Sequence, residues 1–253
     1  MQNYPIKALI FDVDGTLADT ESYHLQAFNQ AFAEVGMDWV WDVPGYTKLL
    51  EVSGGKERLL HYWRSVMPEI RDLNGQAIND AINQIHEIKT AIYTSLLNHG
   101  KVVLRPGVMA LIEEALRAGI KLSIATTTTP ANINALMKQN LGSDWRRDFS
   151  VVGDAHTSPN KKPDPQVYLY VLKMLRLDPD ECIAFEDSGN GLSAAHQAGL
   201  RVVVTPTEFT RHHDFSKAMI VQEDLTTINL DLLTTYPVDK KLHLKRATPN
   251  QTS

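Results

Sequence analysis

The sequence predicts an α/β protein: a Rossmann-like, doubly wound parallel sheet forms the core, and a helical cap domain is inserted into it. Three observations predict this fold. Short apolar runs recur along the chain, helical patterns lie between them, and one long stretch near the N-terminus has helical patterns only. Strands buried on both faces of a parallel sheet read as continuous apolar runs, and helices make the crossovers. The ligand site of such a sheet lies beyond the carboxyl ends of its strands.

The first expected strand, residues 8–11, is a compact apolar run that stops at Asp12. Three later runs have the same character and span residues 122–125, 182–185 and 202–204. We expect all four to be buried strands of one sheet, wound by right-handed crossovers.

A helical pattern precedes the second run. Its apolar residues follow the spacing of one helix face, and they are Val108, Leu111, Ile112, Ala115 and Leu116. Pro106 stands near the expected start, and Gly119 follows as a C-terminal stop. This alternation of strand and helix favours βαβ units.

Between about residues 21 and 97, apolar residues recur at helical spacing and the strand pattern is lost. They are Leu25, Phe28, Phe32, Val35, Leu59, Leu60, Trp63, Ile78, Ile82, Ile85 and Ile92. Because this stretch directly follows the first strand, it should lie over the carboxyl end of that strand. We therefore assign residues 1–20 and 98–236 to the α/β core domain and residues 21–97 to the cap domain. The polar, mildly basic residues 237–253 are expected to form a flexible tail.

Composition limits the partners of this chain. Its 253 residues carry a formal charge of −5, which gives no general reason to expect nucleic acid or an acidic membrane as a partner. Cys182 is the only cysteine, so no intramolecular disulfide forms, and its apolar surroundings predict a buried thiol. No stretch approaches the length of an apolar membrane span, and the N-terminus has no cleavage region. We expect a cytoplasmic monomer.

The strongest chemical signal is the run DVDGT, which starts at Asp12 directly after the first strand. Two carboxylates two residues apart, followed by glycine for a tight turn, can face one cleft. Attack on a dianionic phosphate ester by a carboxylate needs a divalent cation, and Asp12 is placed to be such a nucleophile. Asp14 suits a general acid that later serves as a base. Alone, the pattern also fits an Asx-turn or an adventitious cation site.

A second acidic pair, Glu186 and Asp187, ends the third apolar run. Carboxylates from neighbouring strands are the hard ligands that Mg²⁺ requires, so both are candidate metal ligands. Helix capping by Asp187 or Ser188 is an alternative role that could coexist with metal binding.

Two further loops carry candidate phosphate ligands. Thr126 opens a threonine cluster that ends at Pro130, where a hydroxyl and free N–H groups at a helix start can hold an anion. The same cluster is also ordinary capping chemistry. In the run KKPDP, Lys162 could neutralise a phosphoryl group and pair with Asp12, and it is better placed than Lys161 because the following proline keeps it extended. Most paired lysines are simply solvated.

In order and type, these four elements resemble the motifs of the haloacid-dehalogenase-like hydrolase superfamily: DVDGT, ATTTT, KKPDP and FEDSGNG. The resemblance covers almost the whole chain. It implies Asp12 as nucleophile, Asp14 as acid/base, and Thr126 and Lys162 on the phosphoryl group, with Thr127 beside them. It also implies Mg²⁺ held by Asp12, the backbone carbonyl of Asp14, and Asp187 with Glu186 close by.

Other branches of this superfamily can be compared residue by residue. Its dehalogenases and phosphonatases lack the second aspartate, so Asp14 argues against both. Residues 19–24, DTESYH, resemble a segment of β-phosphoglucomutase, in which His24 would help to position the acid/base aspartate. A phosphomutase therefore stays an alternative. A non-catalytic phospho-ligand module is a second alternative, but it would be expected to lack Asp14.

The cap sequence bears on the substrate. The run GGKER places two cations, Lys56 and Arg58, after the glycines Gly54 and Gly55, and such a loop can bind an anion remote from the reacting centre. A glycine turn before a solvated helix face is the alternative reading.

Together with the earlier motifs and TRHHDF, this run resembles the CbbY group of sugar-bisphosphate phosphatases. That resemblance implies xylulose-1,5-bisphosphate as substrate, with Gly54, Gly55, Lys56 and Arg58 on the uncleaved phosphate. It further implies that Asp19, His24 and Tyr46 contact the sugar.

Two positions depart from related patterns. Asp19 stands where a glutamate is expected in the CbbY group, which shortens the side chain by one methylene. Val52 stands where the mutase branch tends to have lysine. Arg211, His212 and His213 could line the rim of the site or form a solvated basic loop.

Overall fold

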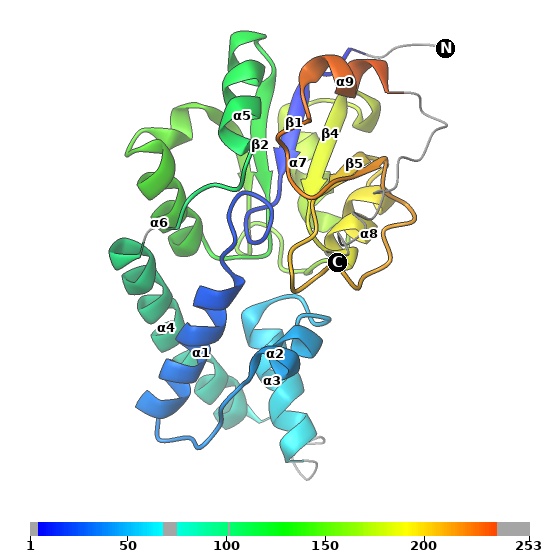
Figure 1. Ribbon diagram of the computed structural model, residues 1–253. Coiled ribbons are helices and arrows are strands. Elements are labelled where there is room, and N and C mark those ends of the chain that lie inside the picture. Colours follow the sequence, from blue (N-terminus) through cyan, green and yellow to red (C-terminus); the bar gives the residue numbers. More distant parts are fainter. Residues whose placement is uncertain (1–4, 68–74, 101, 237–253) are drawn as a thin grey trace, which may run out of the picture.

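The computed structural model describes residues 5–67, 75–100 and 102–236 (Figure 1). Its core is a six-stranded sheet in the order β3-β2-β1-β4-β5-β6, and every neighbouring pair is parallel. The strands are β1 (Ala8–Phe11), β2 (Lys121–Ala125), β3 (Phe149–Gly153), β4 (Cys182–Glu186), β5 (Arg201–Val204) and β6 (Ile220–Val221). The predicted fold class is confirmed. The predicted tail, residues 237–253, lies outside the described residues.

Helices cover both faces of this sheet. They are α5 (Val108–Arg117), α6 (Pro130–Leu141), α7 (Gln166–Leu175), α8 (Gly189–Gln197) and α9 (Leu230–Thr235), with short 3-10 turns at Trp145–Arg147 and Pro179–Glu181. Side chains of β1 alternate between two hydrophobic clusters. Leu9 and Phe11 pack in the cluster that contains α5, α6 and α9, whereas Ala8 and Ile10 pack in the one that contains α7 and α8. The alternation explains the continuous apolar run, because neither face of β1 meets water.

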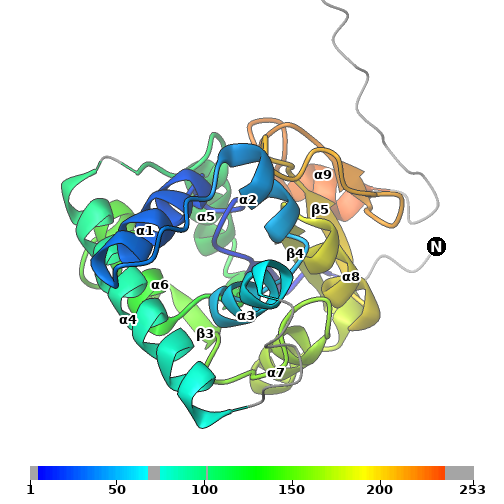
Figure 2. The same ribbon diagram turned by 90° about the horizontal axis from the view of Figure 1, so that it is seen from below.

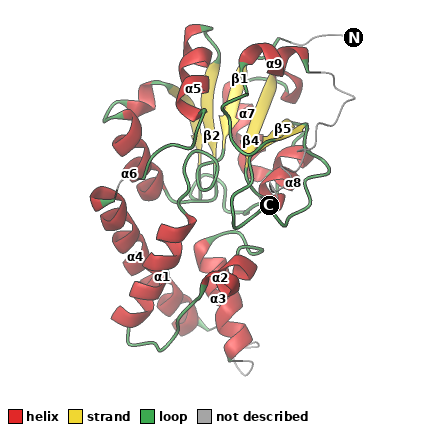
Figure 3. Ribbon diagram, viewed as in Figure 1, coloured by secondary structure: helices red, strands yellow, loops and turns green. Residues whose placement is uncertain are grey.

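Four helices cover the carboxyl ends of the strands. They are α1 (Glu21–Glu34), α2 (Val43–Leu49), α3 (Gly55–Val66) and α4 (Gln76–His99). Figure 3 shows that this part of the described chain contains helices and loops, with the strands confined to the other part. Seen from below, the four helices lie in front of the strand ends (Figure 2). The helical patterns are confirmed, while the domain boundaries at residues 20/21 and 97/98 stay predictions.

An aromatic cluster holds the helical part together and reaches into the core. Phe28, Phe32, Trp41 and Tyr46 are buried in it, together with Phe209, which comes from the loop after β5. The ring of Phe209 packs edge-on against Tyr46, with 6.2 Å between centroids. One side chain of the core therefore belongs to the hydrophobic cluster of the cap.

Among the elements that the sequence analysis did not predict are β3, β6 and α2. β3 and β6 are the two edges of the sheet, and β6 has only two residues. Ser150 is exposed in β3, which interrupts the apolar run. α2 is a seven-residue helix in which only Tyr46 is buried, too short to show a periodic pattern. Within the described part of the chain, no helix has the length and apolarity needed to cross a membrane.

Candidate active site

The strand order brings three predicted residues to one place. β1 lies between β2 and β4, so the residues that follow these strands meet at one edge of the sheet. Asp12, Thr126 and Asp187 accordingly line a single cavity of about 710 Å³. Residues of α1, α3 and α4 line the same cavity from the cap side. The site lies where a parallel sheet is expected to bind its ligand.

Lys162 anchors the buried charges at the floor of this cavity. Its Nζ donates to Asp12 Oδ1 at 2.6 Å and to Glu186 Oε1 at 2.7 Å. Burial lowers the pKa of Lys162. The charges and hydrogen bonds of Asp12 and Glu186 have a larger effect in the opposite direction, so the pKa of the lysine is raised. Burial also raises the pKa of Asp12, against the opposing effect of Lys162. The pairing that the sequence predicted for Lys162 and Asp12 is present.

Glu186 lies behind the cavity. Its Oε1 accepts hydrogen bonds from Lys162 and from the hydroxyl of Tyr168. The residue is 1% exposed and is not among the cavity-lining residues. Its direct contacts are therefore those of a group that holds Lys162 in place.

Asp187 faces the cavity and is the third buried carboxyl group at this place, beside Asp12 and Glu186. Burial raises its pKa well above the usual range, and the neighbouring charges of Asp12 and Glu186 raise it further. Oxygens of these three residues lie within 4.8 Å of one another. Gly15 permits this approach, since a Cβ there would lie 2.4 Å from Asp187 Oδ2. Hard oxygen donors with uncompensated charge suit a divalent cation of the Mg²⁺ type.

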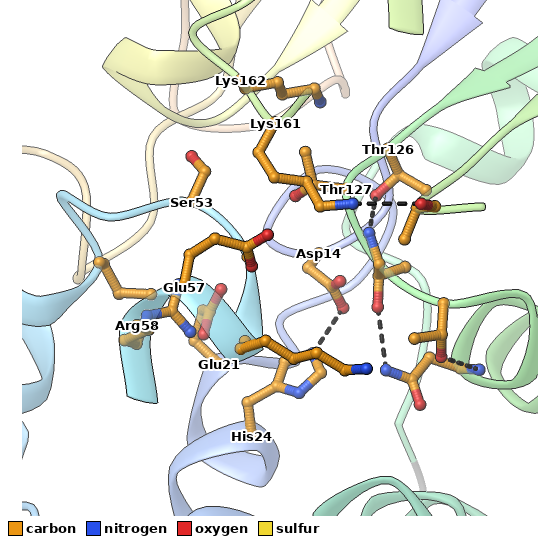
Figure 4. A pocket seen from close by; sticks show the side chains of 18 of the residues that line it. Asp14, Glu21, His24, Ser53, Glu57, Arg58, Thr126, Thr127, Lys161 and Lys162 are labelled. Carbon is orange, nitrogen blue, oxygen red and sulfur yellow. Dashed lines mark hydrogen bonds and ion pairs between the residues drawn. The ribbon is translucent and has the colours of Figure 1, made fainter. Parts of the chain in front are cut away.

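Asp14 is held by three groups. Its Oδ1 accepts hydrogen bonds from Thr20 Oγ1 at 2.6 Å and Tyr93 OH at 3.5 Å. His24 Nε2 lies 3.0 Å from the same oxygen, and Figure 4 shows this contact. Burial raises the pKa of Asp14, but the charge and hydrogen bond of His24 outweigh burial and leave it below its usual range. Asp14 is therefore a carboxylate aimed at the cavity and tied to α1.

Lys89 completes this arrangement and was not found from the sequence. Its Nζ lies 2.5 Å from His24 Nδ1, so Lys89 contacts the ring on the side opposite to the Nε2 that faces Asp14. The side chain is 3% exposed. Burial lowers the pKa of Lys89 to about 7, with Asp14 opposing the shift. A single lysine on an apolar helix face is part of no sequence motif, so the sequence alone did not indicate a role for Lys89 in the site.

The threonine cluster contributes both a helix cap and lining residues of the cavity. Thr129 caps α6, because its Oγ1 accepts from the N–H of Asn132 at 3.4 Å. All four threonines of the cluster line the cavity, and Figure 4 labels Thr126 and Thr127 there. Ser188 likewise caps α8, accepting from the N–H of Gly191 at 3.1 Å. Thr129 and Ser188 also line the cavity, so capping and a place in the site coexist in the same residues.

The cap supplies a cationic wall opposite the strand ends. Gly54, Gly55, Lys56 and Arg58 all line the cavity. Lys56 Nζ donates to Asn83 Oδ1 at 2.7 Å, and Arg58 donates from Nε to the carbonyl of Leu49 at 3.1 Å. These residues come from the loop and first turn of α3, as the sequence predicted.

Two predicted sugar contacts, Asp19 and Tyr46, are not among the residues that line the main cavity. Asp19 is 3.3 Å from Arg105 Nε and lines a smaller, separate cavity. Tyr46 is fully buried and donates its hydroxyl to Glu21 Oε2 at 2.7 Å. Glu21, two residues after Asp19, is the residue that lines the main cavity. At the start of α1, Glu21 therefore reaches the main cavity, whereas Asp19 reaches only the smaller one.

The loop after β5 contributes Thr210 and His213 to the main cavity. His213 lines it, and its Nδ1 accepts from the N–H of Gly189 at 3.0 Å. His212 is half-exposed, and Arg211 lines the smaller cavity. Nearby, Asn190 Nδ2 donates to the carbonyl of Glu51 at 2.9 Å, which joins core and cap at the rim.

Comparison with known proteins agrees with this geometry. A model of the haloacid dehalogenase-like hydrolase family matches residues 6–199. A CbbY protein of Cupriavidus necator is 56% identical over 216 residues, which cover 85% of this chain and 84% of the relative. A mutant CbbY of Rhodobacter sphaeroides, solved in complex with xylulose-1,5-bisphosphate, has a TM-score of 0.79 and 41% identity over 87% of this chain and 95% of that one.

A β-phosphoglucomutase of Clostridium difficile also aligns, with a TM-score of 0.72 over 90% of this chain and 95% of that chain. Its sequence identity is 24%, so this likeness supports the fold alone.

Proposed function

Since the chain belongs to the haloacid dehalogenase-like hydrolase family and is a phosphatase, we propose that it hydrolyses a small sugar bisphosphate, xylulose-1,5-bisphosphate, with Mg²⁺ and through an aspartyl phosphate. One observation carries the proposal. The cavity has a buried carboxylate and lysine at one end, Asp12 and Lys162, and a separate cationic wall with Lys56 and Arg58 on the cap. A substrate with two phosphates would use both ends. The ligand of the Rhodobacter sphaeroides relative has two phosphates as well.

In the proposed first step, a carboxylate oxygen of Asp12 forms a bond to phosphorus while the bond to the sugar oxygen breaks. Asp14 gives its proton to that leaving oxygen. In the second step, Asp14 takes a proton from water, whose oxygen attacks phosphorus and releases Asp12 and inorganic phosphate. His24 holds Asp14 in the carboxylate form that this second step needs. A substrate dianion entering the cavity would raise the pKa of Asp14 toward the protonated form.

The residues that would hold Mg²⁺ are Asp12, Asp187 and the backbone carbonyl of Asp14. When bound, the ion would neutralise the charge between the nucleophile and the phosphoryl oxygens. Thr126 and Lys162 would bind the phosphoryl group on its other sides.

The first test is phosphate release, with Mg²⁺ and with EDTA, from a panel of sugar phosphates. The panel contains xylulose-1,5-bisphosphate, ribulose-1,5-bisphosphate, fructose-1,6-bisphosphate and β-glucose-1-phosphate. We expect selective release from the xylulose compound that EDTA abolishes and added Mg²⁺ restores. Isomerisation of β-glucose-1-phosphate with little free phosphate would instead show a phosphomutase, and release unaffected by EDTA would contradict the metal assignment.

Lys56→Ala tests the cap side of the cavity. We expect the KM for the bisphosphate to rise roughly 10- to 100-fold, the effect of losing one hydrogen bond to a charged group. The KM for a sugar monophosphate should hardly change, because that substrate has nothing to place near Lys56. Lys138→Ala, on α6, is the matched control and should leave both constants unchanged. Equal increases for the two substrates would remove Lys56 from the second phosphate site.

A further inference from the structure

Arg105 lies in the segment that leads the chain from α4 to α5, and its side chain is 8% exposed. This segment runs beside the stretch that follows β1. The N–H of Arg105 donates to the carbonyl of Leu17 at 2.8 Å, and Leu104 pairs with Ala18 in an antiparallel bridge. Ala18 is also bridged to Asp14. The stretch that carries Asp14 and the segment that carries Arg105 are therefore packed together.

The guanidinium group of Arg105 binds backbone carbonyls of three loops, those that follow β1, β5 and β6. Nη1 donates to the carbonyl of Gly15 and to that of Thr205, the latter at 2.6 Å. Nη2 donates to the carbonyls of Pro206 at 3.2 Å and Glu223 at 2.9 Å. A planar guanidinium holds several acceptors in one fixed arrangement, which a single ammonium group does not.

Most of these partners are neutral. The nearest carboxylate is that of Asp19, with Oδ1 3.3 Å from Nε, and its side chain is 69% exposed. The hydrogen bonds to carbonyls are thus the main contacts of a buried cation, and what they bring together is backbone. We conclude that Arg105 arranges loops around the strand ends rather than neutralising a buried charge.

Gly15 is the link between Arg105 and the reaction. It directly follows Asp14, and its φ of +81° belongs to the region that favours glycine. One side of Gly15 faces Asp187, and its carbonyl accepts the hydrogen bond from Arg105. Arg105 is not among the residues that line the main cavity. Its effect on the reaction would therefore pass through this turn and not through contact with the substrate.

We propose that Arg105 is a positioning residue for the acid/base group: it fixes the turn at Gly15 and so holds Asp14 in reach of the leaving oxygen. The inference rests on the proposed acid/base role of Asp14. Proton transfer needs hydrogen-bond geometry, and a displacement of about 1 Å can lower a rate roughly a hundredfold. Binding of the substrate should hardly change, because Lys56 and Lys162 stay in place.

Arg105→Lys tests this role with two substrates that differ in their need for an acid. One is the sugar phosphate that the unaltered protein hydrolyses fastest, whose leaving alkoxide must be protonated. The other is 4-nitrophenyl phosphate, whose leaving nitrophenolate is stable without a proton. We expect kcat/KM, which reports the first step, to fall roughly 10- to 100-fold for the sugar phosphate. It should fall about threefold or less for the aryl ester, and KM for the sugar phosphate should stay the same.

Two further proteins serve as references. Asp14→Asn should show the same contrast between the two substrates, and a larger one. Arg201→Lys is the matched control: its guanidinium also donates to a backbone carbonyl, that of Asp180 at 3.2 Å. Arg201 begins β5 and so lies at the end of the sheet opposite to the cavity. Its replacement should leave both values of kcat/KM unchanged.

The outcomes separate the two levels of the proposal. Equal losses for both substrates in Arg105→Lys, with the contrast present in Asp14→Asn, would overturn the role of Arg105 while that of Asp14 stands. If Asp14→Asn shows no contrast either, the proposed acid/base role fails, and the role of Arg105 fails with it.

A second variant serves if Arg105→Lys folds poorly. Arg105 lines the smaller cavity of about 280 Å³, and Arg105→Ala would widen it enough for a free guanidinium ion to take the vacated place. We expect guanidinium chloride, well below denaturing concentrations, to raise kcat of this variant for the sugar phosphate severalfold. Sodium chloride at the same concentration should not. Recovery of the melting temperature without any recovery of kcat would show a purely structural role and overturn the proposal.

Discussion

Asp12→Asn is expected to lower the rate of phosphate release by roughly four orders of magnitude or more, the usual effect of removing a nucleophile. The amide keeps the shape of the carboxylate but is too weak a nucleophile to attack phosphorus. The fold should remain intact, because Lys162 keeps its bond to Glu186 and one of three crowded carboxylates loses its charge. Phosphate release and thermal unfolding are the two measurements.

The control for this variant is Asp180→Asn, an exposed aspartate at the opposite end of the sheet, in the turn before β4. It should change neither rate nor melting temperature. Turnover by Asp12→Asn at the rate of the unaltered protein would remove Asp12 as nucleophile. Loss of turnover together with a large fall in melting temperature would show a structural role instead.

Lys162→Met is expected to lower the free energy of unfolding by about 3–5 kcal/mol, because it leaves buried carboxylates without their cation. Asp12 and Glu186 are both bonded to its ammonium group, and the lysine is 5% exposed. Activity should be lost as well, since the same ammonium group would bind the phosphoryl oxygens. Chemical denaturation measures the first effect and phosphate release the second.

The adjacent Lys161→Met is the matched control for stability. Lys161 is half-buried, and its Nζ donates a hydrogen bond to the carbonyl of Ala155, so we expect a change of about 1 kcal/mol or less. Adding Glu186→Gln to Lys162→Met should recover part of the lost stability, because it removes one of the unpaired charges. A Lys162→Met protein as stable as Lys161→Met would contradict the anchoring role of Lys162.

The strand-end residues were predictable from the sequence for a physical reason. In a parallel sheet the carboxyl ends of neighbouring strands share one edge, so polar residues that end apolar runs must meet there. Asp12, Thr126 and Asp187 follow this rule. The central strands were predictable because they are buried on both faces, whereas the edge strands β3 and β6 had weaker or shorter patterns.

The cap residues follow no such rule. Glu21, His86 and Lys89 come from long helices whose polar positions outnumber those that reach the cavity. Which of them face inward depends on how α1, α3 and α4 pack against the core, and one sequence does not contain that information locally. The sequence analysis named Asp19 and did not consider Glu21, for the same reason. Both carboxylates stand near the start of α1, and the turn into the helix decides between them.

The packing of Phe209 in the cap cluster opposes opening of the cavity. Moving the cap away from the core would expose this ring to water, at a cost of about 2 kcal/mol. That cost alone would hold the open form to roughly a few per cent of molecules at equilibrium. Substrate would enter through this minor population.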